Sequence, residues 1–367
     1  MSQTPGHGPD RTPALATGSP VPLTRSFDVA LLDLDGVVYV GPDAVPGVPA
    51  ALSAARDAGM RLGFVTNNAS RTPEQVAAHL GELGVPAEAG DVITSSQAAA
   101  SVVLDLLGPR ARVLPVGGPG VPAAMRAAGL TIVEGAADRP DAVVQGYGPE
   151  VGWAQLAEAV VAVRQGARHV ATNTDATVPS PRGPLPGNGA LVGVVSAVTG
   201  RQPLVTGKPD PAMHAECVRR TGARRPLVVG DRLDTDVEGA RRAGAASLLV
   251  LSGVTDPATL LAATPVHRPD HLAHDAAGLL APQPAVDRTA GGWRCGAWEV
   301  RAGEAGVLLL TRPGDGDGDG DGDGLDGLRA LCVAHWGRHP DDGAPARVSA
   351  GDAAATTALE DWSLTGG

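Results

Sequence analysis

The sequence predicts an α/β protein: a doubly wound parallel sheet with an inserted α/β cap domain and a small C-terminal α+β appendage. From Phe27 onward, short apolar runs typical of strands buried on both faces alternate with helical segments. A second set of such elements interrupts this alternation, and the composition shifts again near residue 284. We therefore divide the chain into a leader (1–26), a core (27–94 and 200–283), a cap (95–199) and a C-terminal region (284–367).

Strand and helix signals follow one another along the core. The Thr72-Pro73-Glu74-Gln75 stretch is a capping box with proline at the first helical position, so a helix is expected to begin there. The expected core strands are 27–35, 61–66, 226–230 and 246–251, and the expected core helices are 48–59, about 210–222 and 236–243.

The cap and the C-terminal region each have their own pattern. In the cap we expect helices at 95–107, 121–128 and 153–165, strands at 112–116, 131–134, 141–145 and 168–172, and then a loop rich in proline and glycine from Asn173 to Asn188. In the C-terminal region we expect a hairpin at 293–312 and a helix at 325–337. A glycine-rich stretch at 117–120 resembles a dinucleotide loop only loosely, because no acidic ribose partner follows at the right spacing.

Two segments are expected to lack regular structure. Residues 1–26 are rich in Pro, Gly, Ser and Thr and lack the pattern of a signal peptide, which predicts a disordered leader. The Gly-Asp repeat over 314–324 predicts a solvated loop. Calcium binding is an alternative there, but the spacing matches neither an EF-hand nor a nonapeptide β-roll.

Composition excludes several classes of protein. The chain has 367 residues, of which 43% are apolar and only 2% aromatic, so its cores must be aliphatic. No apolar stretch reaches the ~18 residues of a membrane helix, and a net charge of −11 argues against nucleic-acid binding. Three widely spaced cysteines exclude a disulfide scaffold and indicate a reducing, cytoplasmic compartment; they are Cys217, Cys295 and Cys332.

Carboxylates cluster where predicted strands end. Asp33 and Asp35 face the same way after the first strand, and Gly36 allows a sharp turn. Asp231 and Asp236 follow a later strand, and together these carboxylates form the hard oxygen site that Mg²⁺ prefers. Because ligands bind beyond the carboxyl ends of the strands in such sheets, we expect one shared crevice.

A lysine and two amide side chains lie next to the ends of other predicted strands and helices. The chain contains 28 arginines and one lysine, so Lys208 is a candidate for a task that the larger, planar arginine cannot perform. The stretch Thr66-Asn67-Asn68 offers a hydroxyl and amides to an anionic oxygen. Carboxylates, a lysine, a hydroxyl and a metal around one crevice indicate phosphoryl transfer.

Four ordered motifs resemble those of the haloacid dehalogenase superfamily of phosphatases. They are DLDGVVY (33–39), VTNN (65–68), TGKPD (206–210) and GDRLDTD (230–236). The cap between the second and third motifs, and residues 171–209, resemble the branch of 4-nitrophenyl, phosphoglycolate and pyridoxal phosphatases. The resemblance covers about residues 27–283 and implies a Rossmann-like hydrolase core.

The resemblance implies a role for each motif residue. Asp33 would be the nucleophile that forms an aspartyl-phosphate, and Asp35 would be the general acid and base. Thr66, Asn67 and Asn68 would hold the phosphoryl oxygens, and Lys208 would neutralise charge. The implied Mg²⁺ ligands are Asp33, Asp35 through its backbone carbonyl, Asp231, and Asp236, which would orient metal-bound water, while Asp234 would be solvated or a capping residue.

The cap implies a small phosphate monoester as substrate. Its loop from Asn173 to Pro186 resembles a substrate-contacting loop, with Asn173, Asp175, Val178 and Arg182 as the candidates. The C-terminal region resembles a fragment of a GCN5-related acetyltransferase that lacks the acetyl-CoA loop, so a structural or oligomer-forming role is expected. Because all four motifs lie upstream, deleting residues after about 284 is expected to leave phosphate release measurable.

Resemblance over the whole chain narrows the choice of substrate. Actinobacterial phosphatases that carry such a C-terminal fragment resemble the entire chain, which implies activity on glycerol 3-phosphate. The alternatives are 2-phosphoglycolate, pyridoxal phosphate and a broad 4-nitrophenyl phosphatase activity. A regulatory or binding protein on the same fold is the alternative without catalysis. A homo-oligomer formed through the cap or the C-terminal region is also expected.

Overall fold

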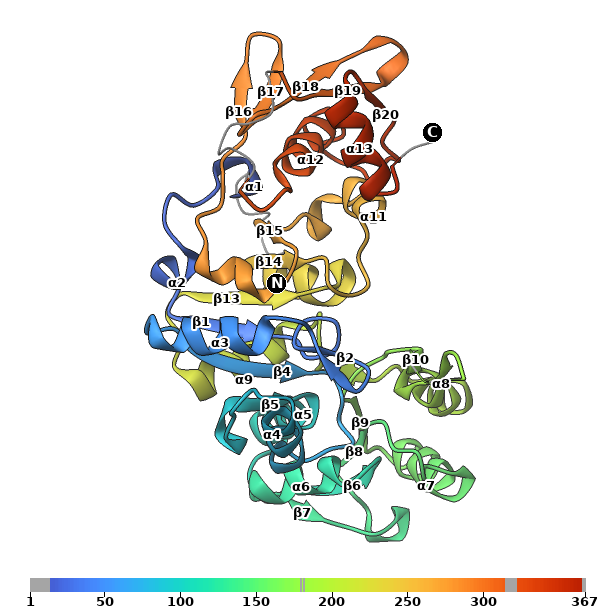
Figure 1. The fold of residues 1–367 in the computed structure, drawn as a ribbon. Coiled ribbons are helices and arrows are strands. Elements are labelled where there is room, and N and C mark those ends of the chain that lie inside the picture. The colour runs from blue at the N-terminus through green and yellow to red at the C-terminus, as the bar shows by residue number, and fades with distance from the viewer. Residues whose placement is uncertain (1–13, 179, 181, 314–321, 365–367) are drawn as a thin grey trace, which may run out of the picture.

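The core is a six-stranded parallel sheet. The computed structural model describes residues 14–178, 180, 182–313 and 322–364. The strands pair in the order β15-β14-β13-β1-β4-β5, so β1 (Val29–Leu32) lies between β13 and β4 (Figure 1). The other strands are β4 (Arg61–Thr66), β5 (Val92–Thr94), β13 (Pro226–Gly230), β14 (Ala246–Val250) and β15 (His271–Ala273). The predicted α/β fold class is confirmed.

Strand β1 is buried on both faces, as its continuous apolar sequence predicts. Ala30 and Leu32 join one hydrophobic cluster, whereas Val29 and Leu31 join a second cluster on the opposite face. Helices pack against both clusters and so make the sheet doubly wound. They are α3 (Val48–Asp57), α4 (Pro73–Glu82), α5 (Ser95–Leu107) and α9 (Pro211–Thr221).

Helix α4 begins at the predicted capping box. The backbone N–H of Thr72 donates to Oε1 of Gln75 at 2.9 Å, and the N–H of Gln75 donates to Oγ1 of Thr72 at 3.4 Å. This reciprocal pair satisfies two of the N–H groups that a helix start leaves without a partner. It also fixes where the loop after β4 ends, and that loop carries the second motif.

The cap contains a parallel sheet of its own, in the order β12-β9-β8-β6-β7. Its strands are β6 (Arg112–Val116), β7 (Thr131–Ile132), β8 (Ala142–Gln145), β9 (Arg168–Ala171) and β12 (Leu204–Val205), and its helices include α6 (Gly120–Ala127) and α7 (Trp153–Arg164). Because Leu204 pairs with Val170, the cap sheet extends past the limit at residue 199 that we expected from the sequence.

The segment after β9 has more regular structure than the sequence predicted. Within the expected loop, β10 (Thr177–Val178) pairs antiparallel with β11 (Leu185–Pro186). Helix α8 (Asn188–Thr199) follows, where no element was predicted. The helix buries Val192 and Val195 but also exposes apolar side chains, so its sequence shows no clear helical periodicity.

The C-terminal region forms a five-stranded sheet with two helices. Strand order is β16-β17-β18-β19-β20, and β20 runs parallel to β19 after an intervening helix. The elements are β16 (Asp287–Thr289), β17 (Gly292–Cys295), β18 (Trp298–Ala302), β19 (Leu308–Thr311), α12 (Asp326–Arg338), β20 (Val348–Ala350) and α13 (Ala353–Asp361). The expected hairpin and helix are both present. Of the Gly-Asp run, residues 314–321 lie outside the described residues.

The expectation of a disordered leader is wrong for residues 14–26. This stretch contains α1 (Ala14–Thr17) and α2 (Leu23–Ser26). The backbone of Ser19 exchanges two hydrogen bonds with that of Gln283, at 2.7 and 2.9 Å. Leu15 and Leu23 are at most 2% exposed, so two apolar side chains hold a segment that is otherwise typical of a linker. Residues 1–13 lie outside the described residues.

The C-terminal region shares a hydrophobic cluster with the core. Leu233 and Val237, from the turn of the fourth motif, join the same cluster as Leu331 and Trp336 of α12. Arg329, also on α12 and 1% exposed, donates to the backbone oxygen of Leu272 in β15 at 2.6 Å. The region is therefore packed into the core rather than attached beside it. No helix among the described residues is long and apolar enough to cross a membrane.

Candidate active site

A crevice of about 560 Å³ opens between the carboxyl ends of the core strands and the cap. The core contributes the ends of β1, β4 and β13, and the cap contributes the segments that follow β8 and β9 (Figure 1). The lining includes every predicted site residue except Asp236 and Arg182: Asp33, Asp35, Thr66, Asn67, Asn68, Asn173, Asp175, Val178, Lys208 and Asp231. The strand ends thus converge as the parallel sheet requires.

Asp33 lies directly after β1 at the floor of the crevice. Its backbone N–H donates to the oxygen of Val229, which ties the first motif to β13 at 2.8 Å. The next turn needs Gly36, whose φ is +83° and where a Cβ would lie 2.3 Å from Oδ2 of Asp231. Asp35 faces the crevice, and loss of hydration followed by the charge of Asp33 raises the pKa of its carboxyl.

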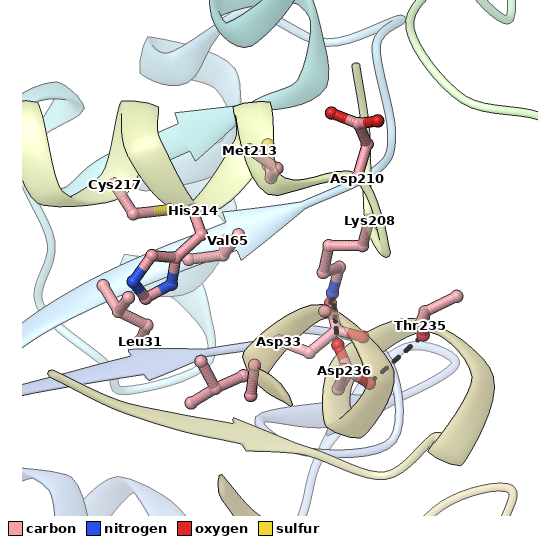
Figure 2. A pocket seen from close by; sticks show the side chains of 13 residues that line it. Leu31, Asp33, Val65, Lys208, Asp210, Met213, His214, Cys217, Thr235 and Asp236 are labelled. Carbon is pink, nitrogen blue, oxygen red and sulfur yellow. Dashed lines mark hydrogen bonds and ion pairs between the residues drawn. The ribbon is translucent and has the colours of Figure 1, made fainter. Parts of the chain in front are cut away.

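Lys208 joins the first and fourth motifs. Its Nζ lies 2.8 Å from Oδ1 of Asp33 and 2.7 Å from Oδ1 of Asp236, and its side chain is 9% exposed (Figure 2). Burial alone would lower the pKa of Lys208, but the negative charges of Asp236 and Asp33 outweigh burial and raise it above its ordinary value. The only lysine of the chain is therefore a protonated bridge between two carboxylates.

A small chamber lies behind this bridge. Figure 2 shows Lys208 and Asp236 at one side of it and the side chains of Leu31, His214 and Cys217 further inside the core. Its volume of about 30 Å³ is close to that of one water molecule and far too small for a phosphate ester. The chemistry therefore belongs to the open crevice on the other side of Lys208.

The carboxylates of the first and fourth motifs fit a divalent cation. Ligand oxygens of Asp33, Asp231 and Asp236 lie within 4.8 Å of one another. Oδ2 of Asp231 accepts from the N–H of Val254 at 2.7 Å, whereas its Oδ1 is buried with no partner among the described residues. Burial and then the charge of Asp33 raise the pKa of Asp231 to about 6. A Mg²⁺ ion would relieve both the unpartnered oxygen and the crowded charge.

Asp236 and Asp234 have different surroundings. Asp236 is buried: Oδ1 accepts from Lys208, Oδ2 accepts from the N–H of Arg232 at 3.2 Å, and burial raises its pKa against the opposing charge of Lys208. Because Lys208 and Arg232 occupy its oxygens, Asp236 fits the role of orienting its neighbours better than that of a direct metal ligand. Asp234 is exposed and pairs with Arg232 at 2.8 Å, as expected of a solvated residue.

The second motif has one residue that faces a ligand and one that supports Lys208. Oγ1 of Thr66 accepts from the N–H of Asn68 at 3.0 Å, which leaves the hydroxyl proton to donate. The side-chain amide of Asn67 instead brackets the backbone of Lys208: Oδ1 accepts from its N–H at 2.8 Å and Nδ2 donates to its oxygen at 3.1 Å. The side chain of Asn68 accepts from Ser70 in a tight turn.

The four predicted cap residues are not equivalent. Asn173 is 3% exposed and donates to the backbone oxygen of Asn67 at 2.7 Å, so it ties cap to core. Asp175 and Val178 line the crevice, and burial raises the pKa of Asp175. Arg182 is exposed and does not line the crevice. The β10–β11 hairpin places Val178 and Arg182 at different depths, which their positions in an apparent loop could not reveal.

Sequence analysis missed several crevice residues, and three of them have side chains with polar groups that matter for ligand binding. Tyr147 follows β8, Asn188 begins α8, and Arg232 belongs to the fourth motif. The position of Tyr147 was a usable signal, because it lies two residues after a predicted strand whose carboxyl end had to face the crevice. Asn188 carried none, because the helix that positions it was not predicted.

Comparison with protein families matches three parts of the chain. Residues 30–131 match the haloacid dehalogenase-like hydrolases, and residues 205–279 match a second HAD-hydrolase-like family. Residues 295–364 match a GCN5-related N-acetyltransferase-like domain. The first two matches contain all four motifs, and the third corresponds to the C-terminal sheet and its helices.

Known proteins resemble the whole chain or its first two parts. The D-glycerol 3-phosphate phosphatase of Mycobacterium tuberculosis is 43% identical over 352 residues, covering 93% of this chain and 96% of that protein. A crystal structure of the glycerol phosphate phosphatase of that organism in complex with magnesium matches with a TM-score of 0.84 and 43% identity, over 94% of this chain and 99% of that one. The acid sugar phosphatase of Staphylococcus aureus is 36% identical, covering 63% of this chain and 89% of that protein.

Proposed function

The chain belongs to the haloacid dehalogenase-like hydrolases, and we propose that this Mg²⁺-dependent phosphatase hydrolyses small phosphate monoesters through an aspartyl-phosphate on Asp33. The observation that carries the proposal is the floor of the crevice. There the carboxylate of Asp33 is held 2.8 Å from Nζ of Lys208 and shares a cation-sized space with Asp231. A fixed nucleophile next to a buried ammonium is the arrangement that phosphoryl transfer requires.

Geometry distinguishes the two oxygens of Asp33. Oδ1 accepts from the N–H of Leu34 at 2.7 Å and from Lys208, so Oδ2 is the oxygen that attacks phosphorus. Lys208 holds Asp33 in place and balances the charge of the phosphoryl oxygens. Asp33, Asp231 and the backbone oxygen of Asp35 would hold a Mg²⁺ ion, which would supply further positive charge against the phosphoryl group.

Asp35 is the proposed general acid and base. Its raised pKa keeps a larger protonated fraction than an ordinary aspartate would have, so it can protonate the leaving alkoxide. The resulting carboxylate then takes a proton from the water that attacks phosphorus of the aspartyl-phosphate. Phosphate leaves, and Asp33 returns as a free carboxylate.

Thr66 and the backbone around Asn67 complete the phosphoryl site. The hydroxyl of Thr66 donates to a phosphoryl oxygen. Because the side chain of Asn67 is engaged by Lys208, we assign that residue a positioning role and leave phosphoryl contact to its backbone N–H. Asn68 shapes the turn that presents both groups.

Glycerol 3-phosphate is the substrate we propose. The whole-chain similarity to the M. tuberculosis enzyme, including the C-terminal region, supports it. A crevice of about 560 Å³ beneath a cap also suits a small ester better than a phosphoprotein. Comparing kcat/KM for glycerol 3-phosphate, 2-phosphoglycolate and pyridoxal phosphate tests the choice, and a large preference for either competitor would overturn it.

Asp33→Asn tests the reaction itself. An amide is not a nucleophile, so phosphate release from 4-nitrophenyl phosphate with Mg²⁺ should vanish while the thermal melt is retained. Asp35→Asn should lose ~10²–10⁴-fold in kcat. The matched control is Asp234→Asn, an exposed aspartate of the fourth motif, which should stay close to wild type. Turnover by folded Asp33→Asn would contradict the mechanism.

We also propose a cytoplasmic location and self-association. The three cysteines are buried and unpaired, which supports a reducing compartment. Helix α8 and β12 expose Val194, Val198 and Leu204 at 45 to 54% of their surfaces, and these residues lie on the cap. Light scattering of the purified chain tests association, and Val198→Glu should shift a dimer towards the monomer.

A further inference from the structure

Tyr147 stands on the cap wall of the crevice. It follows β8, is half-buried, and lines the same cavity as Asp35 and Val40 of the core. Within the described part of the chain, no hydrogen bond involves its phenol hydroxyl. The crevice therefore contains a hydroxyl that can donate and accept and that the phosphoryl chemistry does not use.

The two cationic side chains of the crevice are already engaged. Lys208 pairs with Asp33 and Asp236, and the guanidinium of Arg232 donates twice to Asp234, at 3.0 and 2.8 Å. Tyr147 differs from both because its hydroxyl makes no hydrogen bond to another described residue. It also stands on the cap, across the crevice from the floor where the phosphoryl group is held, which is where the alcohol part of an ester must lie.

The backbone around Tyr147 is firmly held. Its oxygen accepts from the N–H of Gly118 at 3.0 Å, and Nδ2 of Asn188 donates to the oxygen of Gln145 at 3.3 Å, at the end of the same strand. A Cβ at Gly148 would lie 2.5 Å from the nitrogen of Gly118, so only glycine permits this close approach. The backbone that carries the tyrosine is thus held in place before a ligand binds.

The glycine-rich stretch at 117–120 connects the wall that carries Tyr147 to the core. A Cβ at Gly118 would lie 2.8 Å from Cβ of Ser70, and Gly120 donates its N–H to the oxygen of Ser70 at 3.0 Å. The stretch is therefore a spacer between the wall of Tyr147 and the loop of the second motif. It holds the cap wall at a fixed position relative to the phosphoryl site.

Asn188 adds a second polar atom to this wall. Its Nδ2 donates to two backbone oxygens, which fixes the orientation of the amide. Its Oδ1 is buried without a partner among the described residues, and Asn188 lines the crevice at 1% exposure. A buried acceptor without a partner favours a ligand hydroxyl or a water molecule that can donate a hydrogen bond to it.

We propose that Tyr147 is a specificity-determining residue whose hydroxyl binds a hydroxyl group of the leaving alcohol. The inference rests on the proposed function and assigns the substrate class as short polyol phosphates, as opposed to alkyl phosphates. Val40, Val178 and Val254 line the same crevice and pack against the carbon chain. A site built to bond a substrate hydroxyl discriminates against the analogue that lacks it, because its own polar group is then left unpaired.

The test combines one variant with two substrates. Tyr147→Phe removes only the hydroxyl, and propyl phosphate has the carbon chain of glycerol 3-phosphate without its hydroxyls. The full-length protein with Mg²⁺ is assayed for kcat/KM on both esters. Tyr147→Phe should lower the ratio of glycerol 3-phosphate to propyl phosphate about two- to tenfold, the range of one hydrogen bond. The control is Thr131→Val, which removes an exposed hydroxyl from β7 outside the crevice and should leave the ratio unchanged.

Each outcome decides the inference. An unchanged ratio in Tyr147→Phe, including the case in which both values fall together, would overturn it, because a structural role affects both esters alike. Wild-type hydrolysis of propyl phosphate with that result would leave the proposed function standing. If the wild type releases phosphate from neither ester, the proposed function is overturned, and this inference with it.

Discussion

The cap and the C-terminal region meet the same core sheet through different chemistry. Between cap and core lies a crevice lined by carboxylates, amides and a lysine, bridged by hydrogen bonds such as that from Asn173 to Asn67 at 2.7 Å. Between the C-terminal region and the core lies one continuous apolar cluster, and the indole of Trp336 donates to the oxygen of Leu261 at 3.1 Å. The first boundary contains an open crevice, whereas the second is a packed and largely apolar contact.

This difference separates function from stability. Residues at the polar boundary can be changed with little loss of apolar burial, so their effects should appear in kinetics. Residues at the apolar boundary support Leu233 and Val237 beneath the fourth motif, so their effects should appear first in unfolding. The expectation that removing residues after about 284 spares activity is therefore revised: truncation would expose this cluster and destabilise the turn that carries Asp231 and Asp236.

Modification of Lys208 should have the largest effect on activity. Because neighbouring carboxylates raise its pKa, the amine should react slowly with acylating reagents at neutral pH and faster as pH rises. Acylation at this one site should eliminate turnover, and Mg²⁺ with vanadate should protect it. Mass spectrometry can count modified Lys208 against residual activity, with the α-amino group as an internal control. A fully acylated chain that remained active would remove Lys208 from the site.

Trp336→Ala should produce the largest loss of stability. The side chain is 3% exposed and joins the two regions, so its removal should cost about 3–5 kcal/mol of unfolding free energy. Val161→Ala, an exposed apolar position on α7, is the matched control. Denaturant unfolding of the full chain measures both variants. Equal midpoints for Trp336→Ala and the wild type would show that the C-terminal region is a separate unit after all.

Acid should lower the stability of both the cap and the core sheet. Burial lowers the pKa of His169 in the cap and of His271 in β15 to about 4 in each case. Since the folded pKa lies below the unfolded value near 6.5, stability is full above pH 6.5 and is lost as pH falls towards 4. Each histidine should cost about 2 kcal/mol between pH 6.5 and 5.

His169→Asn separates the two contributions. The variant should lose part of the acid sensitivity of the thermal midpoint and keep the part that comes from His271. The measurement is the shift of the midpoint between pH 7.5 and pH 5. A variant with the full wild-type shift would show that His169 is protonated without cost in the folded cap.

Sequence patterns predicted most of the core but little of the boundaries. The strands and the four motifs were readable because strand burial and strand-end chemistry are local signals, as at Asp33 and Lys208. The role of Asn67 could not be predicted, because in a sequence an amide that binds phosphate cannot be distinguished from one that hydrogen-bonds to a neighbouring backbone. Leu15 and Trp336 gave no local sign that they bury against the core, because their partners are distant in sequence.

Arg182→Ala should have the smallest effect. The residue is exposed and does not line the crevice, although its loop resembled a substrate-contacting loop. We expect kcat and KM for glycerol 3-phosphate to stay close to wild type, in contrast to Tyr147→Phe, which changes a cap residue that lines the crevice. Steady-state kinetics on both variants in parallel test this, and a marked rise in KM for Arg182→Ala would mean that the hairpin closes over the substrate.

Trapping the intermediate tests the central claim, that the crevice side of the core performs phosphoryl transfer through Asp33. Enzyme mixed with glycerol 3-phosphate and Mg²⁺ is quenched in acid during turnover and reduced with borohydride, which converts an aspartyl-phosphate to homoserine. Peptide mass spectrometry should find homoserine at position 33 only when substrate is present, and none in Asp33→Asn. Full turnover with an unreduced Asp33, or with homoserine at Asp231 instead, would contradict the account.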